Sequence, residues 1–246
     1  MRFLDYQKGA WVALPEGLEE SVLRERILGC EACISDLDNT DVRSPAVLSA
    51  ELDLASKRIL EPEFIGWCAR TGLRFIGSLA EDSEGWKVDA WEDYFSHFLK
   101  SKAERERLES KLRDYGPERL VYPGVQEFYG LLPAETYKCY HTRNIAELTH
   151  PFMELFGFAE VITDVRDKER LLRKFVEDHP DFRRYLVKGD EEVMPKLGLL
   201  EELSRQKKIE LTVINVAPSR SERHIDSKAV NIGRDYRGLV ELLKAE

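Results

Sequence analysis

The sequence ACISDLDNT, residues 32–40, is an apolar run that ends abruptly in two carboxylates and a hydroxyl. Apolar and small residues followed by a turn-forming Asp-Asn pair predict a buried strand with polar groups at its C-terminal end, where ligands bind in an open α/β sheet. Asp36 and Asp38 would share a face of an ideal strand. Carboxylates this close repel each other unless a cation lies between them or one holds a proton. The stretch therefore indicates chemistry, although a solvated turn after a strand has the same pattern.

The composition is that of a soluble globular protein, with 43% hydrophobic and 34% charged residues among 246. A formal net charge of −9 argues against a nucleic-acid backbone as the main partner, because such sites concentrate Lys and Arg. No apolar run approaches the ~20 residues of a membrane span, and no signal peptide begins the sequence. Four cysteines are too few for a disulfide scaffold. We therefore expect a cytoplasmic protein that binds neither nucleic acid nor membrane.

Strand-like and helix-like segments alternate after this stretch. The further expected strands are residues 136–141, 159–163, 184–188, 211–216 and 228–232, with helical segments between most of them. This alternation predicts a parallel sheet with helices on both faces, which is a Rossmann-like α/β core. A helical block interrupts it. The expected domains are an N-terminal extension at 1–29, the α/β core at 30–44 and 116–246, and an inserted helical domain at 45–115.

Polar residues follow two of the later strands and open one helix. Thr142 comes directly after residues 137–141, Gly189-Asp190 follows residues 185–188, and Lys168 begins a helical segment. Each has a plain local alternative, since Thr142 could cap a helix, Lys168 could start a solvated helix, and Gly189-Asp190 could form a tight turn. Their order and their spacing at strand ends favour a shared site.

Together with Asp36-Leu37-Asp38-Asn39-Thr40, these residues resemble the motifs of the haloacid dehalogenase superfamily, in its phosphatase branch. The resemblance covers most of the chain from Ala32 onward. It implies a Mg²⁺-dependent phosphatase that hydrolyses the phosphate monoester of a small phosphorylated metabolite through an aspartyl-phosphate intermediate. Residues 45–115 resemble the helical cap of the first cap class, which implies a small substrate enclosed over the site.

The resemblance implies roles for the matching residues. Asp36 is the nucleophile, and Asp38 is the acid that protonates the leaving alkoxide and then the base that activates water. Thr142 and Lys168 complete the catalytic set, and both bind the phosphate together with Arg143. An acid at Asp38 also favours a phosphatase over a dehalogenase, because a halide leaving group needs no proton.

The implied cofactor is Mg²⁺, a hard cation that prefers oxygen ligands. The implied ligands are Asp36, the backbone carbonyl of Asp38, Asp190 and Glu191. A second acid often follows four residues after the first in the last motif, but Met194 occupies that position here. Glu191 or Glu192 would have to replace it.

Several alternatives stay open at this point. Lys174 and Lys188 compete with Lys168, although Lys174 falls deeper in its helix and Lys188 lies inside a strand run. The rival function is a catalytically weak or inactive relative that binds a phosphorylated ligand or a protein. The extension at 1–29 lies outside the resemblance, and it could cover a sheet edge or support a homodimer.

Overall fold

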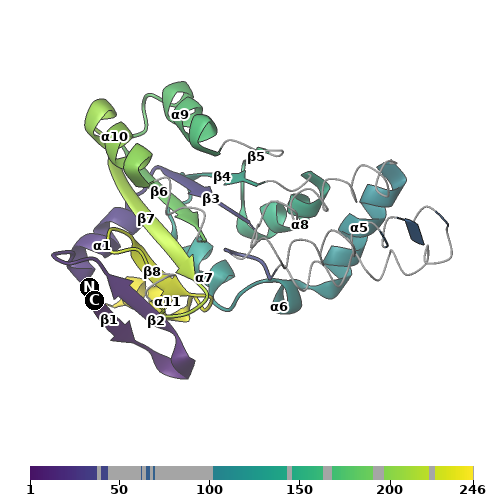
Figure 1. Cartoon of the computed structure of the whole chain (residues 1–246), viewed down its shortest axis with the longest axis horizontal. Coiled ribbons are helices and arrows are strands. Elements are labelled where there is room, and N and C mark those ends of the chain that lie inside the picture. Colours follow the sequence, from purple (N-terminus) through teal and green to yellow (C-terminus); the bar gives the residue numbers. More distant parts are fainter. Residues whose placement is uncertain are drawn as a thin grey trace. The chain divides into compact units, whose positions relative to one another are not determined.

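The computed structural model describes residues 1–37, 40–43, 102–142, 146–162, 168–190, 197–221 and 225–245, with isolated positions between 62 and 69. The chain divides into two compact units, one formed by Met1–Ser44 with Pro117–Glu246 and the other by Pro45–Gly116. All strands found among the described residues belong to the first unit (Figure 1).

The first unit is built on one eight-stranded sheet. Its strands are β1 (Arg2–Asp5), β2 (Trp11–Leu14), β3 (Ala32–Ser35), β4 (Tyr137–His141), β5 (Glu160–Ile162), β6 (Arg184–Gly189), β7 (Glu210–Ala217) and β8 (Val230–Gly233). They are arranged in the order β1-β2-β8-β7-β6-β3-β4-β5. Neighbours from β8 to β5 are parallel, so the predicted Rossmann-like α/β core is confirmed.

The N-terminal residues extend this sheet. β1 and β2 form an antiparallel hairpin, and β2 pairs antiparallel with β8 through Val12 opposite Ile232 and Ala13 opposite Asn231. A three-residue 3₁₀ turn, η1 (Gln7–Gly9), joins the two strands. The residues expected to lie outside the resemblance thus form part of the same unit as the parallel strands.

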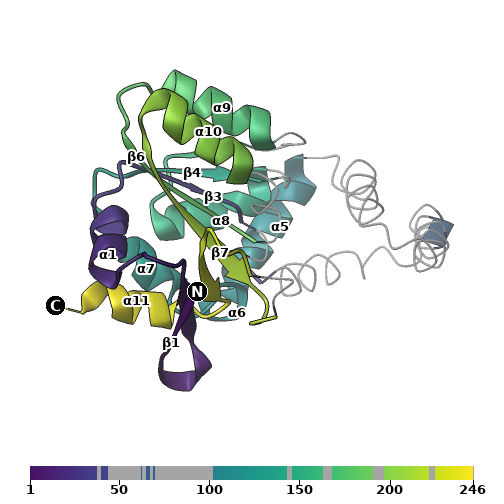
Figure 2. The same ribbon diagram turned by 60° about the vertical axis from the view of Figure 1, so that its left-hand side comes forward.

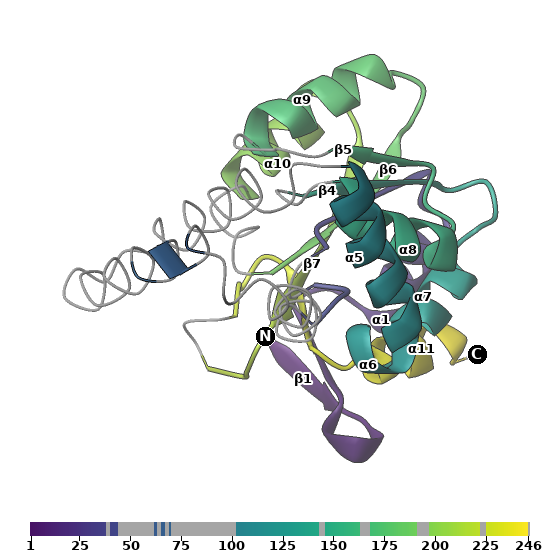
Figure 3. The same ribbon diagram turned by 90° about the vertical axis from the view of Figure 1, so that its right-hand side faces the viewer.

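Helices cover both faces of the sheet (Figure 2, Figure 3). One face carries α9 (Lys168–Asp178) and α10 (Leu197–Lys207), and the other carries α1 (Glu20–Leu28), α7 (Val125–Leu131), α8 (Ala146–Phe156) and α11 (Arg237–Lys244). The short helix α6 (Pro117–Leu120) precedes α7. Within the described ranges, none of the helices combines the length and apolar character needed to cross a membrane.

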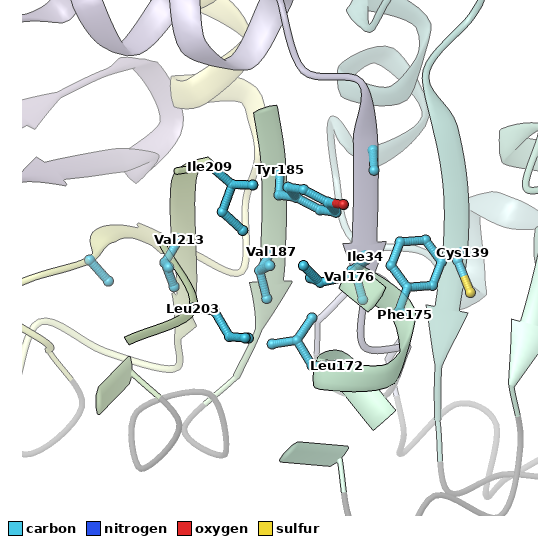
Figure 4. Packing of buried hydrophobic residues seen from close by; sticks show 12 residues of the cluster. Ile34, Cys139, Leu172, Phe175, Val176, Tyr185, Val187, Leu203, Ile209 and Val213 are labelled. Carbon is cyan, nitrogen blue, oxygen red and sulfur yellow. The ribbon is translucent and has the colours of Figure 1, made fainter. Parts of the chain in front are cut away.

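The core beneath α9 and α10 is formed by alternate residues of the strands and by helix residues spaced three and four apart (Figure 4). Ile34 on β3, Cys139 on β4 and Val187 on β6 point to this face of the sheet. Helix α9 meets them with Leu172, Phe175 and Val176, which are spaced three and four residues apart on one helical face. The residues that alternate with these strand positions face the opposite layer.

The second unit contains α5 (Lys102–Tyr115). Leu108 and Leu112 are buried one turn apart, and Glu109 pairs with Arg113 at 2.8 Å on the same helix. Most of the helical cap expected at residues 45–115 lies outside the described residues.

Gly124 provides a test of how the helical layer fits together. It precedes α7 with φ of 82°, and a Cβ at this position would lie 2.7 Å from the Arg237 nitrogen and 2.9 Å from the Tyr236 carbonyl carbon. Replacement of Gly124 by Ala is expected to lower the free energy of unfolding by about 2–3 kcal/mol, because backbone strain and a backbone clash combine. Urea denaturation measures this loss.

Gly130 is the matched control for that substitution. It lies inside α7, and a Cβ there would meet nothing within 4 Å. Gly130→Ala should therefore be neutral or stabilise by up to ~1 kcal/mol. Equal unfolding midpoints for the two variants would contradict the close approach at Gly124.

Candidate functional site

Three of the candidate residues are brought to the same edge of the sheet by strand register. Ser35, the last residue of β3, lies opposite Tyr140 on β4 and Lys188 on β6. Asp36 follows Ser35 directly, Thr142 comes two residues after Tyr140, and Asp190 comes two residues after Lys188. The strands are parallel, so their carboxyl ends lie at one edge. Asp36 is therefore placed between the strand ends that carry Thr142 and Asp190.

Two hydrogen bonds hold Asp36, one through its backbone and one through its side chain. Its N–H donates to the carbonyl oxygen of Lys188 at 2.9 Å, which continues the pairing of β3 with β6. Its carboxylate oxygen Oδ1 accepts the N–H of Leu37 at 2.9 Å. The side chain is only half-buried. The bond from Leu37 orients the carboxylate at the end of β3.

Thr142 and Asp190 differ in their exposure. Thr142 is fully buried, and its N–H donates to the carbonyl oxygen of Ile162 at 3.1 Å, which joins the ends of β4 and β5. Asp190 follows β6 in a bend and is half-buried. Thr142 and Asp190 thus follow the two strands that lie on either side of β3.

Lys168 is the first residue of α9, which follows β5 in the chain. The chain leaves β5 at the carboxyl edge of the sheet, so α9 begins on the side of the sheet where Asp36 lies. Asp38, Arg143 and Glu191 lie outside the described residues, as do Glu192 and Met194. The roles assigned to these residues stay predictions.

The donors that are present suit a hard cation. Asp36 and Asp190 supply carboxylate oxygens at adjacent strand ends, and Mg²⁺ sites commonly use one or two carboxylates with several waters. No group of three His, Cys, Asp or Glu side chains with metal-binding proximity occurs among the described residues. The predicted ligands Asp38 and Glu191 lie outside that part of the chain.

A buried ionic cluster lies directly behind these strand ends. Asp41 and Lys188 are both buried and form an ion pair, with side chains that are 0% exposed. The Asp41 carboxylate also accepts hydrogen bonds from the hydroxyls of Tyr129, Tyr140 and Tyr236. The Ser35 hydroxyl lies 3.0 Å from the same carboxylate and 2.8 Å from the carbonyl oxygen of Asp36. We call these six side chains the Asp41 cluster.

The Lys188 ammonium is enclosed on its other sides. It lies over the rings of Phe128, Tyr129 and Tyr236 at 5.3, 4.5 and 4.7 Å from their centroids, and it donates to the Tyr236 hydroxyl at 3.1 Å. Cation–π contacts of this kind stabilise a desolvated cation. Because Lys188 is buried against Asp41 and these rings, it is not placed to bind a phosphate in the role predicted for Lys168.

The three tyrosines remain hydrogen-bond donors. Burial raises the pKa of Tyr129, Tyr140 and Tyr236 well above the ordinary value, and the negative charge of Asp41 raises it further. A tyrosinate beside a buried carboxylate would be doubly unfavourable. At neutral pH, each phenol thus keeps the proton that it donates to Asp41.

The Asp41 cluster is not among the residues that the sequence patterns predicted, although the sequence contains one signal of it. A lysine within the strand run Tyr185-Leu186-Val187-Lys188 must be buried if the strand is central, and a buried ammonium requires a counter-charge. Asp41, which directly follows the D-x-D-x-T pattern, is a carboxylate close to the same edge. The contributing tyrosines come from α7, β4 and the start of α11, and no local pattern links them.

Comparisons with known proteins bear on the fold. No family model and no curated protein matches the sequence. Among solved structures, the chain is similar to a protein named as a haloacid dehalogenase-like hydrolase, from Burkholderia xenovorans LB400. The TM-score is 0.51 at 16% identity, over 87% of this chain and 98% of that one. The chain has the haloacid dehalogenase fold.

A second structure with some similarity is the HAD-hydrolase YfnB from Bacillus subtilis, which was bound to magnesium. Its TM-score is 0.48 at 14% identity, over 88% of this chain and 99% of that one. The fold of the first structure is the one that the resemblance implied for this chain. At these identities the likeness concerns the path of the chain, and the function has to be argued from the site.

Proposed function

We propose that this protein hydrolyses a small-molecule phosphate monoester in a Mg²⁺-dependent reaction through an aspartyl-phosphate on Asp36. The observation that carries this proposal is the placement of Asp36 between Thr142 and Asp190 at the ends of three adjacent parallel strands. A haloacid dehalogenase fold supports hydrolase chemistry in general. The phosphate ester and the metal are the finer part of the proposal.

The proposed reaction has two displacement steps. In the first, a carboxylate oxygen of Asp36 forms a bond to phosphorus, the bond from phosphorus to the ester oxygen breaks, and the alkoxide takes a proton from Asp38. In the second, Asp38 accepts a proton from water, whose oxygen attacks phosphorus and releases inorganic phosphate and the Asp36 carboxylate. Neither step requires an oxidant or a reductant.

Approach of an anionic nucleophile to a charged phosphoryl group has to be compensated electrostatically. Thr142 would donate its hydroxyl proton to a phosphoryl oxygen, and Lys168 and Arg143 would supply positive charge. Asp36 and Asp190, with the Asp38 carbonyl and Glu191, would hold Mg²⁺. Bound Mg²⁺ supplies charge neutralisation for the phosphoryl oxygens.

The test is hydrolysis of p-nitrophenyl phosphate, and then of a panel of small phosphate esters, with Mg²⁺ and with a chelator. Turnover that requires Mg²⁺ is the expected result. Magnesium alone should also raise the melting temperature of the wild type and not that of Asp190→Asn, because a ligand stabilises only a state that binds it.

Asp181→Asn is a suitable control for Asp190→Asn, because Asp181 is exposed in the turn after α9. It should keep the magnesium response of the wild type. Absence of turnover on the whole panel, together with no magnesium-induced shift at millimolar concentration, would contradict the proposal. That result would favour a phospho-ligand or protein-binding module.

A further inference from the structure

The Asp41 cluster is joined to the three strand ends that carry the proposed site. Ser35, Tyr140 and Lys188 occupy one row across β3, β4 and β6 and bind a single carboxylate. In each strand, the proposed site residue follows its cluster residue by one or two positions. One carboxylate therefore fixes the relative positions of the backbones from which Asp36, Thr142 and Asp190 project.

Asp41 also belongs to the segment that carries the proposed nucleophile. The N–H groups of Asp41 and Val42 both donate to the carbonyl oxygen of Leu37, at 3.0 and 3.1 Å, and close a turn. The far end of the segment is attached to the chain before α7, since Tyr122 N–H donates to the Asp41 carbonyl at 3.0 Å and Arg43 N–H donates to the Leu120 carbonyl at 2.7 Å.

A purely apolar core would not need this cluster. Burial of two charges carries a desolvation penalty, and well-packed apolar residues of similar volume often stabilise a fold equally well. What an ionic cluster with directed hydrogen bonds adds is a defined position for the groups that it joins. Apolar contacts are not directional in this way.

We propose that the buried Asp41–Lys188 pair is a positioning element for the proposed hydrolysis, which holds the segment 36–42 in register with β6 so that Asp36 and Asp190 face a common ligand. This inference rests on the proposed function. Neither residue touches the reacting atoms in this role. Asp41 and Lys188 act through the backbone of the segment and of β6.

The experiment compares the wild type with Lys188→Met and with the double variant Asp41→Asn/Lys188→Met. The double variant contains no unpaired buried charge, and its Asn keeps an oxygen that can accept hydrogen bonds from the tyrosines. Both variants should lower kcat for the best phosphate ester by about tenfold or more at a temperature where they are folded, with KM changed by less than about twofold.

Amide hydrogen exchange gives a readout that does not depend on turnover. The amides of Asp36, Leu37, Asp41 and Val42 all donate within or next to the segment. In both variants they should exchange about tenfold faster or more, while the amides of Tyr185 and Leu186 on β6 keep their wild-type rates.

Leu23→Ala controls for a loss of stability alone. Leu23 is fully buried in α1, a helix that contributes no side chain to the Asp41 cluster. It should lower the melting temperature without a change in kcat or in exchange of the segment 36–42. A fall in kcat equal to that of Lys188→Met would mean that lost stability is the whole effect, and would overturn the proposal.

The remaining outcomes are equally decisive. If the double variant recovers both melting temperature and kcat, with unchanged exchange in the segment, the pair only stabilises the fold. If the wild type hydrolyses no ester of the panel and shows no magnesium-induced shift, the proposed function fails, and the exchange rates alone decide whether the pair positions the segment. If neither variant folds, Tyr236→Phe, which loses bonds to Asp41 and to the Thr40 carbonyl, is measured in the same way.

Discussion

Replacement of Asp36 by Asn is expected to lower kcat for phosphate ester hydrolysis by about 10³-fold or more. The amide has nearly the shape of the carboxylate, and its oxygen can still accept the Leu37 N–H bond that orients the side chain. It cannot form the aspartyl-phosphate, because it lacks the anionic oxygen that attacks phosphorus. The measurement is turnover under saturating Mg²⁺ and ester, on protein whose melting temperature and far-ultraviolet spectrum match the wild type.

Asp181→Asn again provides the matched control, since it makes the same chemical change on an exposed turn. Its kcat should equal that of the wild type. Rapid-quench labelling with a ³²P-ester adds a second measurement, with acid-stable protein label expected in the wild type and none in Asp36→Asn. Retention of activity by Asp36→Asn would assign the nucleophile to another group and remove the central step of the proposed mechanism.

Replacement of Asp41 by Asn is expected to lower the free energy of unfolding by about 3–5 kcal/mol. The substitution leaves the Lys188 ammonium buried without a carboxylate, and the hydroxyl donors of the cluster must share one carbonyl oxygen. Aromatic faces around Lys188 compensate only part of this loss. Equilibrium denaturation in urea measures the change.

The pair between Glu201 and Lys228 serves as the comparison. It joins the same two kinds of group at 2.9 Å, but its side chains are 48% and 61% exposed. Glu201→Gln should leave the unfolding midpoint unchanged within error, since water solvates the remaining lysine. Similar losses for Asp41→Asn and Glu201→Gln would show that burial of the Asp41–Lys188 pair has no energetic consequence.

The two halves of the buried pair should also differ from each other. Lys188→Met leaves the Asp41 carboxylate, which still accepts hydrogen bonds from Ser35 and from the tyrosine hydroxyls. Asp41→Asn leaves the Lys188 ammonium, which among the described residues then contacts only the Tyr236 hydroxyl and three aromatic rings in addition to the amide. We therefore expect the lysine substitution to be the milder of the two. This asymmetry is the reason for using Lys188→Met to measure positioning.

The sequence was informative where its patterns are local. The apolar run at residues 32–35 predicted β3, and the alternation of later segments predicted the parallel core. Strand limits shifted by only one or two residues, as with β8 at Val230–Gly233 against an expected 228–232. Hydrophobic periodicity and turn-forming residues depend on neighbours in the sequence, so they can be identified in a single sequence.

Contacts between residues that are far apart in the sequence could not be predicted from local patterns. Lys188 and Asp41 are 147 positions apart, and a lysine in a strand run shows only that some counter-charge is needed. The hairpin at the N-terminus illustrates the same limit, because its strand pattern does not specify which sheet edge it joins. Asp38, Arg143 and Glu191 remain predictions from the resemblance.

The N-terminal hairpin of β1 and β2 covers the edge of β8, although it contributes no residue to the candidate site. Without β1 and β2, the backbone of β8 would offer its unpaired N–H and C=O groups to any other chain, and all four of its residues are buried. The outermost strand is instead β1, four residues long with Arg2 and Asp5 at its ends, which is a poor template for aggregation. Removal of the first fourteen residues would thus expose the backbone edge of β8 and promote aggregation by edge-to-edge strand pairing.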